Sequence, residues 1–305
     1  MQDKQSIIRS FVEERPKSEA IYGYGSGVFK QIENSNPQID LIFIVDDLKE
    51  WHQENIEYNR KDYSYIGKIH LSLDSIKSIK GHNNITYFSN IQKGENRFKY
   101  GVIEVEDFTK SLTTWNNTFI SGRFHKPVLA IKEEKNISHA IDINRKYALA
   151  ITSLLSPSLT NRLEFLQTLC SLSYIGDTRM LLAENPYKVS NIVLSNYSDL
   201  SYIYLNENMY LTITENDILI NHYHILKNIE MYLPSSLIDF LAENNTNLNE
   251  ISEVRNNILK YIIQHNRVES YHQTLEGFST NGIIRSIPYI LAKIDKRLNG
   301  QRIKY

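Results

Sequence analysis

The chain has 305 residues, of which 41% are hydrophobic and 23% are charged, and its formal net charge is −1. This is the composition of a folded globular protein with length for about two domains, and it provides no overall basic field for nucleic acid or anionic membrane. The single cysteine, Cys170, excludes a disulfide framework and a cysteine-ligated zinc site.

The first third of the sequence predicts alternating helices and strands. Residues 6–14 have the apolar spacing of a short helix, and residues 21–24 form a strand that enters a glycine-containing turn. Residues 39–45 are continuously apolar apart from Asp40, as in a central strand that is covered on both faces. A helix follows Asp47, with Leu48 and Trp51 inward, and residues 98–105 form a further strand. We therefore expect a mixed α/β domain over residues 1–132.

The rest of the chain is predicted to be mostly helical. Apolar residues recur at helical spacing over 138–155, and Thr160 is placed to cap a second helix over 163–170. Residues 133–200 are therefore assigned to a helical domain. Residues 202–224 alternate like strands, with turns near 206–208 and 215–217, and helices are expected near 235, over 250–265 and over 283–298. These segments make up a C-terminal region over 201–305.

The glycine-containing turn is the first candidate for chemistry. Gly25 and Gly27 flank Ser26, and successive amides of such a turn can approach a phosphate closely while the hydroxyl donates a hydrogen bond. A bare Gly-Ser-Gly is more often only a tight turn between two elements. Its meaning therefore depends on the residues of the neighbouring strand.

A carboxylate lies inside the apolar strand after this turn. Asp40 comes 14 residues after Ser26, and a charge in such a strand is costly unless it is paired or binds a cation. This layout is typical of the polymerase-beta nucleotidyltransferase fold, in which strand carboxylates hold magnesium. That fold usually has a second carboxylate two residues after the first, but this sequence has Ile42 at that position. We favour Asp46 as the second catalytic and metal-binding residue and Asp47 as a helix cap, while Asp47 or a residue elsewhere stays open as the ligand.

With these residues the sequence resembles the mitochondrial translocator assembly and maintenance proteins, which are phosphatidate cytidylyltransferases, and their bacterial relatives. Matching segments occur in order between about residue 22 and residue 195: Tyr24–Phe29, Ile39–Asp47, Trp51-His52 with Asn55, Tyr63-Ser64, Lys99–Ile103, Trp115–Asn117, Gly122-Arg123 with Lys126-Pro127, Ala140 with Asn144 and Ala148, Leu172–Met180, and Lys188–Val193. Beyond that the likeness thins, and the family's basic stretch appears only as His272-Gln273 and Glu276-Gly277.

The resemblance implies a Mg²⁺-dependent enzyme that makes CDP-diacylglycerol and pyrophosphate from CTP and phosphatidic acid. It also implies a winged-helix-like second domain and peripheral attachment to a membrane surface. The N-terminal 15 residues show neither a secretory signal nor a transit peptide, so we expect a bacterial enzyme at the cytoplasmic face of the cell membrane rather than a mitochondrial one. Nucleic acid is not expected as a partner, and a homo-oligomer is compatible with the sequence.

Charged residues in the matching segments supply the remaining site candidates. Lys99 and Tyr100 join the turn as nucleotide-binding residues, although Tyr100 also suits a core position. Arg123 and Lys126 are expected to bind substrate phosphate, since arginine and lysine are the usual cations for it, and the alternative is solvated surface charge. Asp177 and Arg179 are expected to reach the substrate or to form a structural salt bridge; the two readings are even.

Two other functions fit part of this pattern. A nucleotidyltransferase with another acceptor would share the same metal site. A non-catalytic winged-helix binding module should carry a basic helix face, which residues 163–172 lack.

The last predicted helix is amphipathic. Residues 283–298 have an apolar stripe with Lys293, Lys296 and Arg297 near its end. Such a helix is expected either to lie on the bilayer or to pack on the body of the protein.

Overall fold

The structure is a computed structural model that describes residues 4–25, 27–28, 38–63, 84–182 and 185–281. The chain forms two compact units. The first comprises the described residues within Met1–Thr109, Val128–Ser138 and Gln273–Ile287, and the second those within Lys110–Pro127 and His139–His272. The chain therefore leaves the first unit and returns to it.

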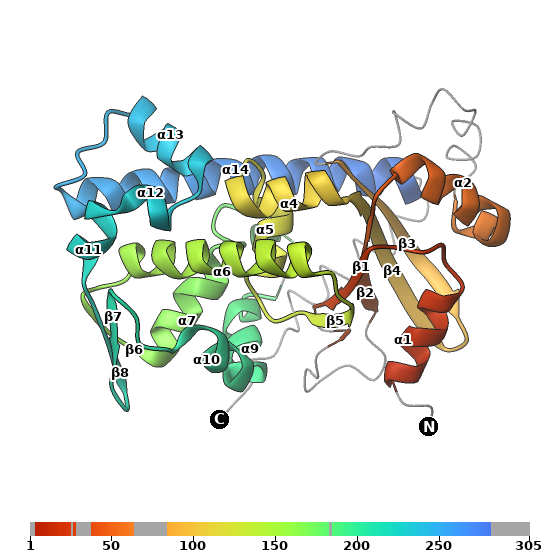
Figure 1. Cartoon of the computed structure of the whole chain (residues 1–305), viewed down its shortest axis with the longest axis horizontal. Coiled ribbons are helices and arrows are strands. Elements are labelled where there is room, and N and C mark those ends of the chain that lie inside the picture. Colours follow the sequence, from red (N-terminus) through yellow and green to blue (C-terminus); the bar gives the residue numbers. More distant parts are fainter. Residues whose placement is uncertain (1–3, 26, 29–37, 64–83, 183–184, 282–305) are drawn as a thin grey trace. The chain divides into compact units, whose positions relative to one another are not determined.

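The first unit is built on a five-stranded sheet (Figure 1). Its strands are β1 (Ala20–Tyr24), β2 (Ile39–Val45), β3 (Ile85–Lys93), β4 (Asn96–Glu104) and β5 (Leu129–Lys132), in the order β3-β4-β2-β1-β5. β2 pairs parallel with β4, and the other pairs are antiparallel. β2 is central and almost wholly buried, as its apolar sequence predicts. The expected mixed α/β class is confirmed.

Two helices cover one face of this sheet. α1 (Lys4–Glu13) and α2 (Leu48–Asn59) bring Phe11 and Trp51 into a core with the inward side chains of β2 and β4. The Phe11 and Phe98 rings stack with their centroids 3.8 Å apart. Burying aromatic rings of this size stabilises the unit through the apolar area removed from water. The helices and strands predicted for residues 6–45 and the helix after Asp47 are confirmed.

Beneath α2 lies a buried polar network. His52 Nδ1 is 2.9 Å from the Tyr63 hydroxyl, and Asn55 Nδ2 donates to the hydroxyls of Tyr63 and Tyr100 at 3.0 and 3.1 Å. Tyr100 in turn donates to Asp62 at 3.0 Å. Buried polar groups need such partners, because an unmade hydrogen bond there costs free energy. The network holds α2, the 3₁₀ turn η1 (Arg60–Asp62) and β4 together.

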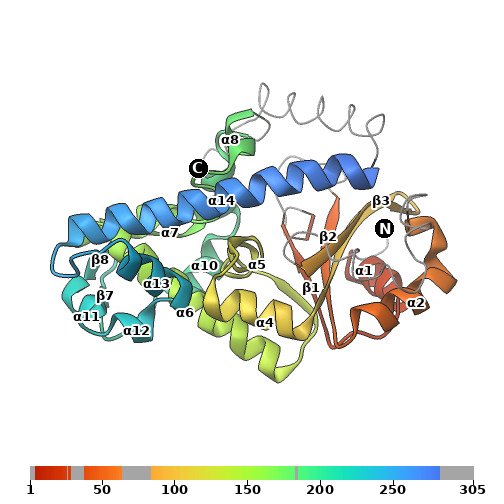
Figure 2. The same ribbon diagram turned by 90° about the horizontal axis from the view of Figure 1, so that it is seen from above.

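The second unit is mainly helical. Its long helix α14 (Ile251–Asn281) lies beside α8 (Thr178–Leu182; Figure 2), where the Thr178 and Ser270 hydroxyls are 2.9 Å apart, and its core contains Phe165, Leu169 and Tyr261. α4 (Val105–Thr114) and α6 (Lys135–Leu155) begin in the first unit and end in the second. The remaining described helices are α5 (Thr118–Phe124), α7 (Arg162–Ser171), α8 (Thr178–Leu182), α9 (Lys188–Ser195), α10 (Tyr197–Tyr204), α11 (His222–Lys227), α12 (Ile229–Tyr232), α13 (Ser235–Glu243) and α14 (Ile251–Asn281).

A small antiparallel sheet completes the second unit. β6 (Leu159–Asn161), β7 (Leu211–Ile213) and β8 (Asp217–Ile220) lie in the order β6-β8-β7. Thr160 belongs to β6 and is buried opposite Ile218, so its expected role as a helix cap is wrong. The cap of α7 is the next residue, Asn161, whose side chain accepts from the Glu164 amide at 2.8 Å.

Several predicted elements of this unit are confirmed and one is not. The helices expected over 138–155, near 235 and over 250–265 correspond to α6, α13 and α14. The strand pattern expected over 202–224 is wrong at both ends, since residues 202–204 end helix α10 and residues 222–224 begin helix α11. Between them, β7 and β8 lie on either side of the expected turn near 215. The amphipathic stretch at 283–298 lies outside the described residues. Within the described part of the chain, no helix combines the length and apolarity needed to cross a bilayer.

Candidate active site

The turn after β1 has a geometry that only glycine allows at two positions. Gly25 has a φ of +74°, and a Cβ built at Gly27 would lie 1.8 Å from the Gln38 carbonyl oxygen. The Val28 amide donates to the Gly25 carbonyl at 3.2 Å and closes the turn. The glycine turn, Gly25 with Gly27, is thus pressed against the residues that begin β2. Ser26 between them lies outside the described residues.

Asp40 lies beside this turn on the central strand. Its Oδ2 would be 3.4 Å from a Cβ at Gly25, so the carboxylate faces the turn closely. In the sheet register Asp40 is opposite Tyr24 of β1 and opposite Lys99 of β4. Directly opposite residues present their side chains to the same face, with neighbouring strands about 4.8 Å apart. A carboxylate, an ammonium and a phenol therefore share one row of the sheet.

Lys99 is held on this face by an aromatic neighbour. Its Nζ lies 4.5 Å from the centroid of the Tyr87 ring. Tyr87 can lie so close because it is opposite Gly101, where any Cβ would approach the Tyr87 ring to 2.8 Å. The cation–π contact fixes the direction of the lysine side chain. The sequence-predicted residues Gly25, Gly27, Asp40 and Lys99 are therefore brought together in the first unit.

Asp46 is not brought to this row. It follows the last residue of β2 and is exposed, six residues beyond Asp40. A regular strand rises about 3.3 Å per residue, which separates the two α-carbons by about 20 Å. Mg²⁺ binds its oxygen ligands at about 2.0–2.1 Å, so Asp40 and Asp46 do not ligate one ion together. Asp47 caps α2, as expected, with its Oδ1 accepting from the Glu50 amide at 2.8 Å.

Tyr100 is adjacent to Lys99 in sequence but faces the opposite side of the sheet. Successive strand residues alternate, and Tyr100 is fully buried in the core with α1 and α2. Its hydroxyl belongs to the network with Asn55 and Asp62. Burial raises the pKa of this hydroxyl well above its usual value. Tyr100 is thus placed to hold β4 against α2 rather than to contact a nucleotide.

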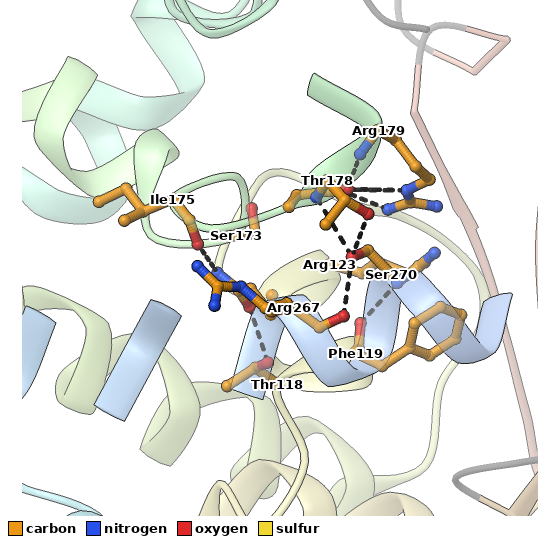
Figure 3. Close-up of polar contacts among 12 residues, drawn as sticks. Thr118, Phe119, Arg123, Ser173, Ile175, Thr178, Arg179, Arg267 and Ser270 are labelled. Atoms are coloured by element: carbon orange, nitrogen blue, oxygen red, sulfur yellow. Dashed lines mark hydrogen bonds and ion pairs between the residues drawn. The ribbon is translucent and has the colours of Figure 1, made fainter. Parts of the chain in front are cut away.

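In the second unit, Arg123 lies near the end of α5. Its Nη1 donates to the Phe119 carbonyl at 2.6 Å, and its guanidinium carbon lies 3.6 Å from the centroid of the Phe119 ring (Figure 3). The Asn117 side chain starts this helix by accepting from two of its amides. The stacking and the carbonyl contact fix the guanidinium plane, which favours bidentate recognition of an oxyanion.

Lys126 lies one turn further along the chain. Its Nζ donates to the Gly122 carbonyl and to the Ser173 hydroxyl, and lies 5.1 Å from the centroid of the Tyr174 ring. Burial lowers the pKa of Lys126 to about 7. The amine is thus protonated in part of the molecules at neutral pH, and a bound anion would favour its charged form.

Asp177 and Arg179 form a salt bridge, which is one of the two roles left open for them by the sequence. Asp177 accepts from the Arg179 Nε at 3.0 Å and from its Nη2 at 2.6 Å, and it also accepts from the Arg179 amide. The Asp177 side chain is 4% exposed and that of Arg179 is 29% exposed. A buried carboxylate therefore fixes a guanidinium that still meets solvent.

Two residues near Lys126 have no individual role predicted from the sequence. Tyr174 follows Ser173, and Lys188 begins α9 with its Nζ 5.2 Å from the centroid of the Tyr174 ring. Both lie in segments that carry the family resemblance, but Lys188 is 62 positions after Lys126 in the sequence. Only the fold brings the two lysines to one ring.

The metal-binding capacity of the described residues is small. Among them, no three His, Cys, Asp or Glu side chains gather closely enough to hold an ion by themselves. Mg²⁺ is commonly bound by one or two carboxylates together with substrate phosphates. Asp40 beside the glycine turn fits that mode, because the turn would bring phosphate oxygens to the carboxylate.

Comparison with known proteins gives a consistent result. A family model described as "Phosphatidate cytidylyltransferase, mitochondrial" matches residues 5–231. The protein of that name from Schizosaccharomyces pombe is 30% identical, over 90% of this chain and 79% of its own. The protein from Caenorhabditis elegans is 26% identical, over 93% of this chain and 95% of its own length. The protein from Homo sapiens is 33% identical, over 66% of this chain and 45% of its own length. These matches confirm the resemblance drawn from the sequence.

The same comparison corrects the expected location. The three proteins named above are all described as mitochondrial, so the expected location at the cytoplasmic face of a bacterial cell membrane is wrong. That expectation rested on the composition of the first 15 residues, which does not decide where a protein resides.

Proposed function

The chain belongs to the family of mitochondrial phosphatidate cytidylyltransferases, and we propose from this premise that it transfers CMP from CTP to phosphatidic acid. The products are CDP-diacylglycerol and pyrophosphate. The observation that carries the proposal is the meeting of the glycine turn, Asp40 and Lys99 on one face of the first unit's sheet.

The reaction is an in-line displacement at the α-phosphorus of CTP. A phosphate oxygen of phosphatidic acid forms the new bond, and the bond between the α-phosphorus and the bridging oxygen to the β-phosphate breaks, so pyrophosphate leaves with that electron pair. A phosphate monoester is already largely ionised at neutral pH, because its second pKa is about 6. The enzyme therefore needs positioning and charge stabilisation more than a general base.

The first unit supplies the nucleotide side of this chemistry. The amides of the glycine turn and the Ser26 hydroxyl approach the triphosphate, and Lys99 offsets its negative charge. Asp40 would hold Mg²⁺, which when bound stabilises charge on the transferring phosphoryl group. Asp46 takes no part in this arrangement, because it lies at the far end of β2.

The second unit supplies cations for the phosphate of the acceptor. Arg123 and Lys126 have fixed side-chain directions, and Arg179 is oriented by the buried Asp177. Arginine recognises phosphate oxygens in pairs, whereas lysine acts as a point charge. In this assignment Asp177 is a positioning residue that holds the Arg179 guanidinium.

The finer fold assignment rests on the same elements. We assign the first unit to the polymerase-beta nucleotidyltransferase type, since a glycine turn leads from β1 to a carboxylate-bearing central strand. The three short strands beside α7 support a winged-helix-like description of the second unit. Peripheral attachment to a membrane follows from the lipid substrate and is part of the proposal.

The test is a direct assay with CTP labelled at the α-phosphorus, phosphatidic acid in mixed micelles, and Mg²⁺. We expect label in the lipid extract and equimolar pyrophosphate in the aqueous phase. Folded protein that releases pyrophosphate but labels another acceptor would be a nucleotidyltransferase of different substrate. Folded protein that consumes no CTP with phosphatidic acid present would overturn the proposal.

A further inference from the structure

One asparagine of helix α14 contacts two separate segments of the second unit. Asn266 is buried, and its Oδ1 accepts from the Thr118 hydroxyl at 2.7 Å. Its Nδ2 donates to the carbonyls of Leu172 and Ile175, both at 2.8 Å. Thr118 is the first residue of α5, whereas Leu172 and Ile175 lie in the turn between α7 and α8 (Figure 3). One side chain thus joins α5 to this turn.

The chemistry of these partners fits an asparagine side chain. The two carbonyls can only accept, so the amide nitrogen must face them and the amide oxygen must face the hydroxyl. A carboxylate of the same size could not donate to the carbonyls. An apolar side chain would remove all three contacts at a buried position, where unmade hydrogen bonds cost free energy.

The segments that Asn266 joins are also tightly packed. A Cβ built at Gly122 of α5 would lie 2.8 Å from the Ser173 Cβ in the turn. The same turn is pressed against α14, because a Cβ at Gly176 would lie 2.7 Å from the Ile263 α-carbon, and Gly176 has a φ of +82°. Interiors packed this closely transmit a displacement from one segment to the next.

A second contact of α14 holds the start of α8. The Ser270 Oγ is 2.9 Å from the Thr178 Oγ1 and also accepts from the Thr178 amide at 3.2 Å (Figure 3). Asp177, which precedes Thr178, holds the Arg179 guanidinium. α14 therefore fixes both α5 and the segment that leads into α8. These two segments carry cations that are proposed above to bind the acceptor phosphate.

We infer that Asn266 is a positioning residue for the acceptor phosphate, because it sets the segment that carries Arg123 against the segment that carries Arg179. The inference rests on the proposed function, which assigns these arginines to the phosphate of phosphatidic acid. Asn266 acts through the segments that it joins, since it is buried and both of its polar atoms bind the protein. Its loss should therefore impair use of the acceptor and leave CTP binding, which is assigned to the first unit, unchanged.

The experiment measures acceptor and nucleotide separately in the full chain. Dihexanoyl phosphatidate, a soluble form of the lipid, and CTP with Mg²⁺ are each titrated calorimetrically, and KM is determined for both substrates. We expect Asn266→Ala to weaken phosphatidate binding and to raise its KM by about tenfold or more, because misplacement by about 1 Å can cost about 100-fold. The Kd and KM of CTP should match wild type.

A milder variant and its rescue test the same contact. Thr118→Val removes only the hydroxyl that donates to Asn266 and keeps the size of the side chain. It should raise the KM of phosphatidate by about threefold, the scale of one neutral hydrogen bond, whereas Thr118→Ser keeps the hydroxyl and should match wild type.

Asn257→Ala is the matched control. Asn257 is also on α14 and donates to a threonine hydroxyl, that of Thr246, at 2.9 Å. Losing this contact should leave the KM of both substrates unchanged. Circular dichroism and thermal unfolding check that each variant is folded, and if Asn266→Ala does not fold, the two Thr118 variants decide.

The outcomes separate the positioning role from the reaction. Unchanged phosphatidate affinity in folded Thr118→Val, equal losses for phosphatidate and CTP, or an equal loss in Asn257→Ala would overturn the role of Asn266 and leave the proposed transfer intact. Thr118-dependent binding of dihexanoyl phosphatidate by a protein that makes no CDP-diacylglycerol would support that role and overturn the proposed function. Wild-type protein that binds no phosphatidate and makes no product would overturn both.

Discussion

At the scale of single residues, Asp40 places a charged side chain in a half-buried position of an apolar strand. It is half-buried in an apolar strand and faces both the glycine turn and Lys99. A neutral side chain of the same size would be easier to bury there. We propose that cation binding explains the carboxylate at this position.

The first prediction compares two carboxylates of the same strand segment. Asp40→Asn should lower CDP-diacylglycerol formation by roughly 100-fold or more, since even the outer partners of metal ligands are worth 10–100-fold. Asp46→Asn should leave turnover within about threefold of wild type, because Asp46 lies about 20 Å along the strand. Both rates are measured at saturating CTP, with thermal unfolding as the check on folding. Equal losses in the two variants would place Asp46 in the site.

The second prediction concerns the pH dependence of stability. Lys126 has a pKa of about 7 in the folded protein against 10.5 ordinarily, so the unfolded chain binds more protons between these values. The free energy of unfolding should therefore rise with pH across this window, by at most about 1.4 kcal/mol per pH unit from this group. Lys126→Met should remove that contribution. Denaturant unfolding of both proteins at pH 7, 8 and 9 gives the difference; parallel curves would contradict the prediction.

At the scale of elements, α2 stabilises the fold, whereas the preceding strand β2 carries the candidate site residue Asp40. Asp47 follows β2 and caps the N-terminus of α2. Trp51, His52 and Asn55 lie on the buried face of α2. These three residues belong to the segments that carry the family resemblance. The structure explains them by packing and hydrogen bonds under the sheet, on the face opposite Asp40.

The third prediction tests that division. Asp47→Ala should lower the free energy of unfolding by about 1 kcal/mol, the usual effect of losing a helix N-cap. Its turnover per folded molecule should match wild type, because the cap lies at the far end of β2 from Asp40. Urea unfolding and the lipid-labelling assay measure the two quantities. Asp47→Asn, which can still cap, serves as the control and should retain the stability.

Sequence patterns locate elements well where the apolar signal is strong. The unbroken apolar run of β2 predicts its limits, and helical spacing predicts α6 and α14. β3 and β5 are not predicted, since the buried positions of β3 are few and β5 has four residues. The Thr160 cap is wrong by one residue, because Thr and Asn are both good caps and only the path of β6 decides between them.

The site is predictable only in part, for a related reason. Spacing along a strand predicts which face of the sheet a residue lies on, but it does not bring two residues of that strand together. Asp40 and Asp46 could bind one ion only if the chain turned back between them. They do not meet, because β2 stays extended. Lys99 and Tyr100 are expected together, yet the alternation of β4 sends them to opposite faces. Lys188 has no local signal, because its proximity to Lys126 is created by tertiary packing.

At the scale of the whole molecule, the proposed reaction requires the protein to reach a lipid. The sequence of residues 283–305, outside the described residues, combines an apolar stripe with flanking cations. Such a pattern suits either a bilayer interface or a protein core. Removing it distinguishes the two, because only the second role is needed for folding.

The fourth prediction is therefore a truncation. Protein ending at residue 282 should fail to sediment with liposomes that contain phosphatidic acid, while CTP binding and the unfolding transition are retained. Replacing Lys293, Lys296 and Arg297 by Gln in the full chain is the milder variant and should weaken sedimentation in a salt-dependent manner. A truncated protein that still sediments would place the membrane contact elsewhere, and one that is unfolded would assign the stripe to the core.

The buried network beneath α2 has a consequence for how relatives of this chain are classified. His52, Asn55, Tyr63 and Tyr100 hold the unit together without touching the face that carries Asp40. A descendant could keep all four and lose Asp40, and it would still fold and still score as a member of the family. If Asp40 has the role proposed above, such a protein would be a pseudoenzyme that whole-sequence similarity cannot tell from an active one. Inspection of the single position equivalent to Asp40 would identify it.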